Sequence, residues 1–104
     1  MIPKHKRGIN HIYALRRNRG YLQKHLATLV GHRYIQMVSE YETGRSLPPL
    51  ETALALEIVL GARLSEIYVD LYQELRLLVL KRADKLPLET RRRLRSRLHG
   101  KDCP

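Results

Sequence analysis

Glycines divide residues 15–67 into segments of helical periodicity, each too short to form a stable helix by itself. Gly20 and Gly44 end two of these segments, and Gly31 lies between the second segment and the third. At Gly31 the chain is expected to turn sharply, because glycine adopts the left-handed backbone conformation at little steric cost. No strand-like alternation of apolar and polar residues is visible. The sequence therefore predicts an all-α domain whose short helices stabilise one another by packing.

The spacing of apolar residues predicts five helices, with a sixth near the end of the chain. Asn10 and Ser65 are placed to cap the first and the fifth helix. Val38 and Tyr41 lie three residues apart and are expected to pack inward, which leaves Gln36, Ser39 and Glu40 on the outer side of the third helix. The expected ranges are 11–19, 23–30, 33–42 or 34–42, 50–60, 65–83 and 87–98.

Two of these helices carry apolar stripes. The fourth carries Leu50, Leu54 and Ile58, with Ala53 and Ala55 on its flank. The stripe of the fifth helix is wider than one small core needs. We therefore expect either that it packs against a second subunit or that it covers the back of the domain. This stripe consists of Ile67, Tyr68, Leu71, Tyr72, Leu75, Leu78 and Val79.

Positive charge is concentrated at the two ends of the chain, which has a net charge of +10. Residues 1–20 hold six Lys or Arg and no acidic residue, and residues 81–104 hold nine against three. Residues 21–80 have a net charge of −2. Basic ends on a near-neutral body suit a polyanionic partner, because Lys and Arg release counterions from phosphates. The alternative is a solvated basic surface.

The composition argues against several classes of protein. Cys103 is the only cysteine, so an intrachain disulfide or a cysteine-based metal cluster is not expected, and a reducing cytoplasm fits. No apolar stretch approaches the roughly 20 residues of a membrane span, and the charged first residues lack a signal-peptide core. The sequence contains no set of acidic, basic and nucleophilic residues in a catalytic pattern. The five histidines do not have the spacing of metal ligands. We expect no catalysis, no metal and no cofactor.

Residues 15–67 contain a set of residues that is specific when taken together. It consists of Leu15-Arg16, Gly20, Gln23, Leu26-Ala27, Gly31, Ser39, Tyr41-Glu42, Gly44-Arg45, Pro48, Leu50-Glu51-Thr52, Leu60-Gly61 and Leu64. With this set the chain resembles the lambda-repressor-like, or Xre/Cro-type, helix-turn-helix family of bacterial and phage regulators. The resemblance implies a five-helix DNA-binding domain with a C-terminal helical extension.

The resemblance also implies a function and a domain organisation. The expected function is a sequence-specific, nucleoid-associated transcriptional regulator, more a repressor than an activator, which binds double-stranded DNA as a homodimer on an inverted repeat. Residues 1–9 would form a basic arm and residues 10–68 the DNA-binding domain. Residues 69–104 would form a basic helical extension for dimerisation or for a protein partner.

The same resemblance assigns roles to single side chains. Gln36 resembles the family's principal base-contacting residue, since glutamine can pair bidentately with adenine. Glu40 resembles a second base-contacting residue, where a carboxylate can accept a hydrogen bond from the amino group of cytosine. Arg16 and Glu42 correspond to a structural ion pair between the first helix and the end of the third. The expected base contacts are Arg33, Tyr34, Gln36 and Glu40, and the expected phosphate contacts are Gln23, Lys24, Ser39 and Arg45.

The chain departs from the family pattern in two places. The spacing from Gly31 to Ser39 is one residue longer than usual, which places an insertion within residues 32–34. Residues 33–35 are therefore each candidates for contact with the groove or with a phosphate. Leu22 stands where a Ser or Thr usually caps the second helix. A missing cap costs about 1 kcal/mol, so tertiary packing must stabilise that helix.

Two other functions use the same features. An antitoxin of a toxin–antitoxin pair would bind DNA with this fold and hold its toxin with the basic tail, residues 81–104, which requires an acidic groove on the toxin. A small RNA-binding protein would grip the RNA backbone with both basic ends. The lack of a set of stacking aromatic residues or a glycine-rich loop argues against RNA.

Overall fold

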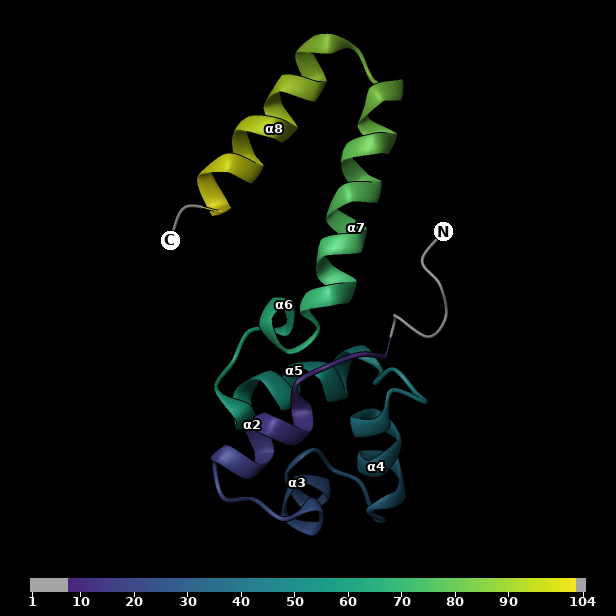
Figure 1. The fold of residues 1–104 in the computed structure, drawn as a ribbon, viewed down its shortest axis with the longest axis vertical. Coiled ribbons are helices and arrows are strands. Elements are labelled where there is room, and N and C mark those ends of the chain that lie inside the picture. Colours follow the sequence, from purple (N-terminus) through teal and green to yellow (C-terminus); the bar gives the residue numbers. More distant parts are fainter. Residues whose placement is uncertain (1–7, 103–104) are drawn as a thin grey trace. The chain divides into compact units, whose positions relative to one another are not determined.

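The computed structural model describes the backbone of residues 8–102 and the side chains of residues 8–98. Residues 1–7 of the expected basic arm and Cys103 lie outside the described residues. The described chain is helical and contains no strand, which confirms the all-α prediction (Figure 1). Its elements are α2 (Ile12–Asn18), α3 (Gln23–Leu29), α4 (Gln36–Thr43), α5 (Leu50–Leu60), α6 (Leu64–Ile67), α7 (Val69–Arg82), the 3₁₀ helix η1 (Ala83–Lys85) and α8 (Leu88–Asp102).

The chain divides into two compact units, one up to Tyr72 and one from Gln73 onward. The first unit holds a hydrophobic core, to which α2 to α6 each contribute an inner face. Val38 and Tyr41 are each 1% exposed, as the spacing in the third helix predicts. The core consists of Ile12, Leu26, Ala27, Val38, Tyr41, Leu56, Leu60, Ile67 and Tyr68.

Helix α4, which corresponds to the predicted helix over residues 33–42 or 34–42, begins later than predicted. It starts at Gln36, so the expected start at Arg33 or Tyr34 is wrong, and these two residues lie in the loop before the helix. The Nε2 atom of His32 lies 3.0 Å from the Tyr41 hydroxyl, which ties the beginning of the loop to the core. Residues 32–35 therefore form a loop that is held at His32, and the helix follows it from Gln36.

The helix predicted over residues 50–60 forms as α5 with these bounds, but a different face of it packs against the core. Leu50, Leu54 and Ile58 are 71%, 45% and 80% exposed. The buried residues are Thr52, Ala53, Leu56 and Leu60. Apolar residues lie on nearly every side of this helix, so periodicity does not distinguish its inner side from its outer side.

The predicted helix over residues 65–83 is wrong as a single element. It breaks at the buried Tyr68, whose backbone angles are φ −114° and ψ 55°, into α6 and α7. The carbonyl oxygen of Ile67 accepts a hydrogen bond from the His11 N–H at 2.9 Å, which joins the end of α6 to the start of α2. Ser65 is not the cap. The chain enters α6 at Arg63, whose N–H donates to Glu66 Oε1 at 3.1 Å.

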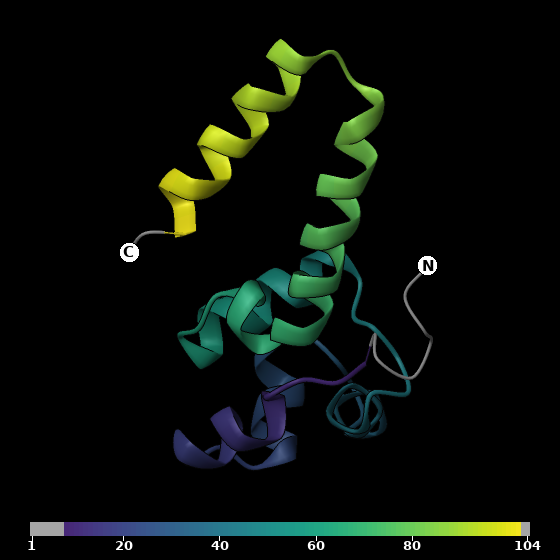
Figure 2. The same cartoon turned by 45° about the horizontal axis from the view of Figure 1, so that its top comes forward.

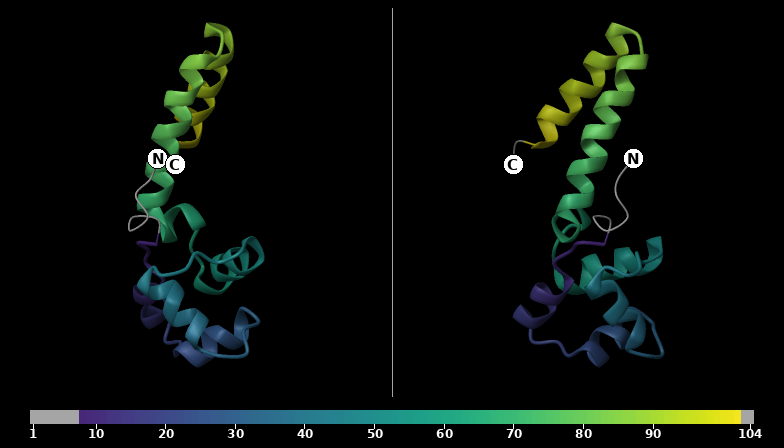
Figure 3. Two further views of the ribbon diagram at one scale, coloured as in Figure 1. Left: turned by 90° about the vertical axis from the view of Figure 1, so that its right-hand side faces the viewer. Right: turned by 45° about the vertical axis from the view of Figure 1, so that its right-hand side comes forward.

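The second unit is a helical hairpin. After η1 the chain turns back, and α8 diverges from the part of α7 that follows Gln73 as it leaves the turn (Figures 2 and 3). The last helix begins at Leu88, one residue later than expected, and extends to Asp102. Its residues Leu94 and Leu98 are half-buried. Ala83 is the one fully buried side chain among residues 73–98. This hairpin therefore has almost no core of its own.

The C-terminal end of α4 packs closely on the segment before α2. Gly44 caps α4 with φ +80°, and a Cβ atom added there would lie 2.8 Å from the carbonyl oxygen of Gly8. The Nδ2 atom of Asn10 donates to the carbonyl oxygens of Gly8 and Tyr41 at 2.6 and 2.7 Å. Its Oδ1 atom accepts from the Ile12 N–H at 2.9 Å. The cap residue of α2 is His11, so Asn10, the expected cap, lies one position before it. The side chain of Asn10 thus joins the backbone of α4 to the segment before α2.

Gly44→Ala should destabilise the fold more than Gly20→Ala. Both glycines have φ +80°, but a Cβ atom at Gly20 meets nothing within 4 Å, whereas one at Gly44 meets the Gly8 backbone. The left-handed conformation alone costs about 1–2 kcal/mol for alanine. Urea unfolding of both variants measures the difference. Equal losses would show that the contact between Gly8 and Gly44 is not tight in solution.

Candidate nucleic-acid interface

A buried ion pair joins α2 to α4. The Nε atom of Arg16 donates to Glu42 Oε2 at 2.5 Å, and each side chain is 6% exposed. A second nitrogen, Nη2, lies 3.4 Å from Glu42 Oε1, and Nη1 donates to the carbonyl oxygen of Tyr21 at 2.8 Å. Desolvation of two charges is costly, and it is offset here by several short hydrogen bonds. The pair holds α4 in a defined orientation on α2.

Gln23 is the first residue of α3, and its side chain extends this network. Its Nε2 atom donates to Glu42 Oε1 at 2.9 Å. Leu22 offers no acceptor for a cap, and His25 partly compensates, since its Nδ1 atom accepts from the Leu22 N–H at 3.0 Å. The sequence does not predict this role of His25, because the usual residue three positions after the cap is Glu or Gln. Lys24 is exposed on the same turn.

The outer side of α4 carries the exposed side chains of the helix. Gln36 is the first helical residue and is exposed, and Met37 beside it is 36% exposed. Thr43 is exposed in the last turn, but its hydroxyl donates back to the Ser39 carbonyl at 2.9 Å. Met37 was not predicted as a site residue. With the helix starting at Gln36, Met37 lies in its first turn beside Gln36.

The loop before α4 presents a cation on an aromatic ring. The guanidinium carbon of Arg33 lies 5.8 Å from the centre of the Tyr34 ring. Tyr34 is 63% exposed and Ile35 is 48% exposed. Because these residues directly precede Gln36, the structure brings Arg33, Tyr34 and Gln36 together at the amino-terminal end of α4.

Three other predicted residues lie toward the carboxyl end of α4. The carboxylate of Glu40 accepts a hydrogen bond from the Ser46 hydroxyl at 2.8 Å, and its backbone carbonyl accepts from the Arg45 N–H at 2.9 Å. Arg45 is exposed, while Ser39 and Glu40 are half-buried. Glu40 therefore shapes the loop after α4 with one carboxylate oxygen, whatever its other oxygen contacts.

Two tyrosines beneath this surface have perturbed acidities. Burial raises the pKa of Tyr41 above its usual range, and burial raises the pKa of Tyr68 to about 12. Both phenols are therefore protonated at neutral pH, so no charge from these two groups disturbs the core under α4. Within the described residues, no group of three His, Cys, Asp or Glu side chains is arranged to hold a metal ion.

Comparison with known proteins adds one match. A family model described as helix-turn-helix matches residues 12–67, which is more than half of the chain. No curated protein matches the sequence. Among the described residues, no helix combines the length and the apolar character needed to cross a membrane.

Glu42→Ala should destabilise the protein by about 3–5 kcal/mol, because it leaves the buried Arg16 charge without its carboxylate. Arg17→Ala is the control, because it removes the charge next to Arg16 on α2 without touching the ion pair. Arg17 is exposed and stacks on Tyr13 with its guanidinium carbon 5.8 Å from the ring centre, so its loss should cost at most about 1 kcal/mol. Chemical denaturation measures both values. Similar losses in the two variants would contradict a structural role for the pair.

Proposed function

The chain belongs to the lambda-repressor-like helix-turn-helix family of DNA-binding regulators, and from this premise we propose that it is a repressor that reads an inverted repeat as a homodimer. The observation that carries the proposal is the exposed amino-terminal end of α4, with Gln36 as its first residue. Such a regulator acts in the cytoplasm, on the nucleoid.

In this proposal α4 is the recognition helix. One side of it is fixed by Val38 and Tyr41 in the core, and Glu42 is held by the ion pair with Arg16. The amino-terminal residues of a recognition helix contact base edges in the major groove. A rigid helix suits this task, because base readout depends on hydrogen bonds of narrow geometry.

Each base contact follows from the chemistry of its side chain. Gln36 pairs with adenine through its amide, and the Glu40 oxygen that is not bonded to Ser46 accepts from the amino group of cytosine. Arg33 and Tyr34 approach the groove or its edge from the loop before α4. Arg33 suits guanine or a phosphate, and the exposed Tyr34 ring offers apolar contact to a thymine methyl group.

Phosphate contacts flank the reading surface. The amide of Gln23 has two N–H groups, and its hydrogen bond to Glu42 uses one of them, so the second can donate to a phosphate. Lys24 and Arg45 are exposed and add positive charge, and Ser39 contributes a hydroxyl. The basic ends of the chain add affinity without specificity, because phosphate contacts carry no base information.

Dimerisation would place two copies of α4 in successive major grooves, about 34 Å apart. Exposed apolar residues of α7 support a subunit contact, since Tyr72, Leu75 and Val79 are 41%, 43% and 42% exposed. The three residues follow a spacing of three and four, so they lie on one side of the helix. Pairing this stripe with its copy would remove it from water.

Gln36→Ala should cost roughly 1–3 kcal/mol on the best duplex site and relax the base preference at one position. Selection from a randomised duplex pool at about 150 mM salt measures this, because non-specific electrostatic binding weakens there. Gln73→Ala is the matched control, an exposed glutamine outside the helix-turn-helix. If the Gln36 variant keeps the parent's sequence profile, Gln36 does not read a base.

Leu75→Glu should convert the homodimer to a monomer in sedimentation equilibrium, because charges would face each other across the stripe. Ile58→Glu places the same change on another exposed apolar stripe, that of α5, and should leave the dimer intact. Dissociation by Ile58→Glu alone would move the subunit contact to α5. A parent protein that stays monomeric at high concentration would rule out the dimer.

A further inference from the structure

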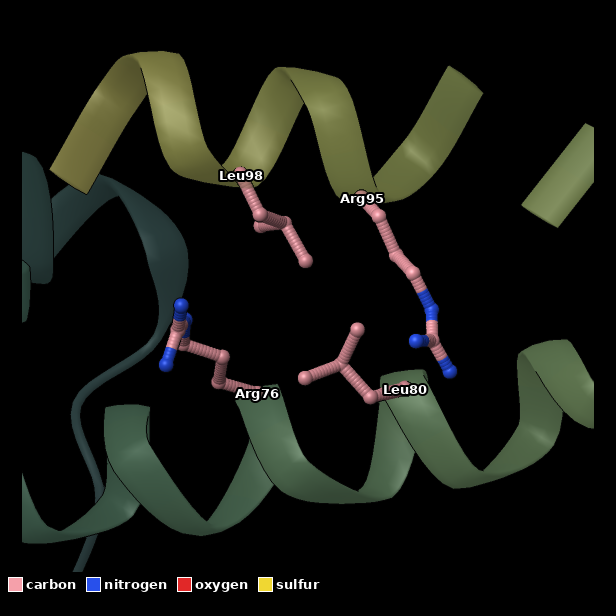
Figure 4. Close-up of a pocket in the computed structure, with 4 residues that line it drawn as sticks. All are labelled: Arg76, Leu80, Arg95 and Leu98. Atoms are coloured by element: carbon pink, nitrogen blue, oxygen red, sulfur yellow. The ribbon is translucent and has the colours of Figure 1, made fainter. Parts of the chain in front are cut away.

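The hairpin of the second unit contains a cleft between its two helices. A cavity of about 220 Å³ is lined by Arg76 and Leu80 of α7 and by Arg95 and Leu98 of α8. Figure 4 shows the two leucines pointing toward one another from facing helices, with the two arginines at the sides of the cavity. The cleft thus combines an apolar floor with cationic edges.

A second cavity continues this surface along α8. It has a volume of about 250 Å³ and shares Arg95 with the first cavity. Its lining repeats the same two residue types, since it consists of Leu88, Arg91, Arg92 and Arg95. Because the two cavities share Arg95, we treat their lining as one surface, which we call the α8 groove and which combines leucines with arginines.

The hairpin leaves most of its apolar side chains uncovered. Leu88, which lines the second cavity, is 56% exposed, and Leu77 and Leu86, which lie outside both cavities, are 61% and 44% exposed. Leu80 and Leu98 are only half-buried although they face each other across the cleft. Burial of such side chains is a main source of folding free energy, so an occupant of the groove would stabilise the hairpin.

The hairpin is also strongly basic. Residues 73–104 contain ten Lys or Arg and four acidic residues, a net charge of +6. One of these acids, Asp84, lies 3.8 Å from Arg91 at the edge of the groove. An occupant must therefore match both the leucines and the excess of positive charge.

Three kinds of occupant can be compared on these two criteria. Duplex DNA matches the arginines but leaves the leucines of the groove in water. A second copy of the groove covers the leucines but sets its own arginines against Arg91, Arg92 and Arg95, unlike the uncharged stripe of Tyr72, Leu75 and Val79 in the proposed homodimer. An acidic amphipathic helix satisfies both criteria, because its apolar side covers the leucines and its carboxylates face the arginines.

We propose that the α8 groove is the docking site for an acidic amphipathic helix of a partner protein. Apolar side chains of this helix enter the cavity between Leu80 and Leu98, and a carboxylate pairs with Arg95 at the junction of the two cavities. Arginine suits this position, because its planar fork binds a carboxylate with two hydrogen bonds. The inference adds a protein partner to the proposed function, and it does not depend on base readout.

The test uses the full chain and three fluorescent peptides of equal length. The first is a designed helix with leucines on one side and glutamates on its flanks, the second is a scrambled sequence of the same composition, and the third replaces every glutamate by lysine. Fluorescence anisotropy at about 150 mM salt limits non-specific charge effects. We expect the designed peptide to bind at least about tenfold more tightly than the scrambled one, and the lysine peptide not to bind.

A pair of charge-matched variants locates the site. Arg95→Glu should weaken the designed peptide about tenfold, whereas Arg93→Glu makes the same change at an exposed arginine outside both cavities and should have a smaller effect. Both positions are exposed, so neither variant should unfold the hairpin. Both should reduce binding to non-specific duplex equally.

Three results would overturn the proposal. Equal binding of the designed and the scrambled peptide would reduce the groove to a diffuse basic surface, and equal effects of Arg95→Glu and Arg93→Glu would remove the specific site. Competition between the designed peptide and self-association of the chain would assign the groove to a second copy instead. The Gln36 measurement on duplex DNA is independent of all three, so failure here leaves the proposed DNA function standing.

Discussion

The orientation of the helix-turn-helix depends on the buried pair of Arg16 and Glu42. Its two charges are almost fully removed from water, a cost that their mutual attraction and their close hydrogen bonds must offset together. Glu42 accepts from both Arg16 and Gln23, so one carboxylate connects α2, α3 and α4. Since all three helices are short, this connection supplies rigidity that backbone hydrogen bonding within seven or eight residues does not.

Tyr41 provides a second point of attachment for α4. Its ring is buried in the core, its hydroxyl lies 3.0 Å from His32, and its carbonyl oxygen accepts from Asn10. One residue thus contacts the loop before α4 and the segment before α2. The close approach of Gly8 and Gly44 fixes the end of the same helix. The side of α4 away from these contacts is left for Gln36 and its neighbours.

The local pattern of residues predicted some of this structure and not the rest. Val38 and Tyr41 could be placed because α4 has one apolar side, whereas α5 is apolar nearly all round, and its exposed stripe could not be told from its buried side. The break at Tyr68 accompanies a hydrogen bond between His11 and Ile67, which are distant in the sequence. The start of α4 was misplaced for a similar reason, because the bond between His32 and Tyr41 is not visible in periodicity. The roles of the individual site residues rest on the family resemblance and stay predictions.

The two units differ in what stabilises them. The first has a core of nine buried residues, so its fold is supported from within. The second buries only Ala83 among residues 73–98 and is rich in arginine, so little free energy opposes the conformational entropy of the unfolded chain. Any molecule that binds only the folded hairpin shifts its folding equilibrium by mass action. The stability of the second unit should therefore follow the concentration of the proposed partner helix, while the core of the first unit does not depend on such a partner.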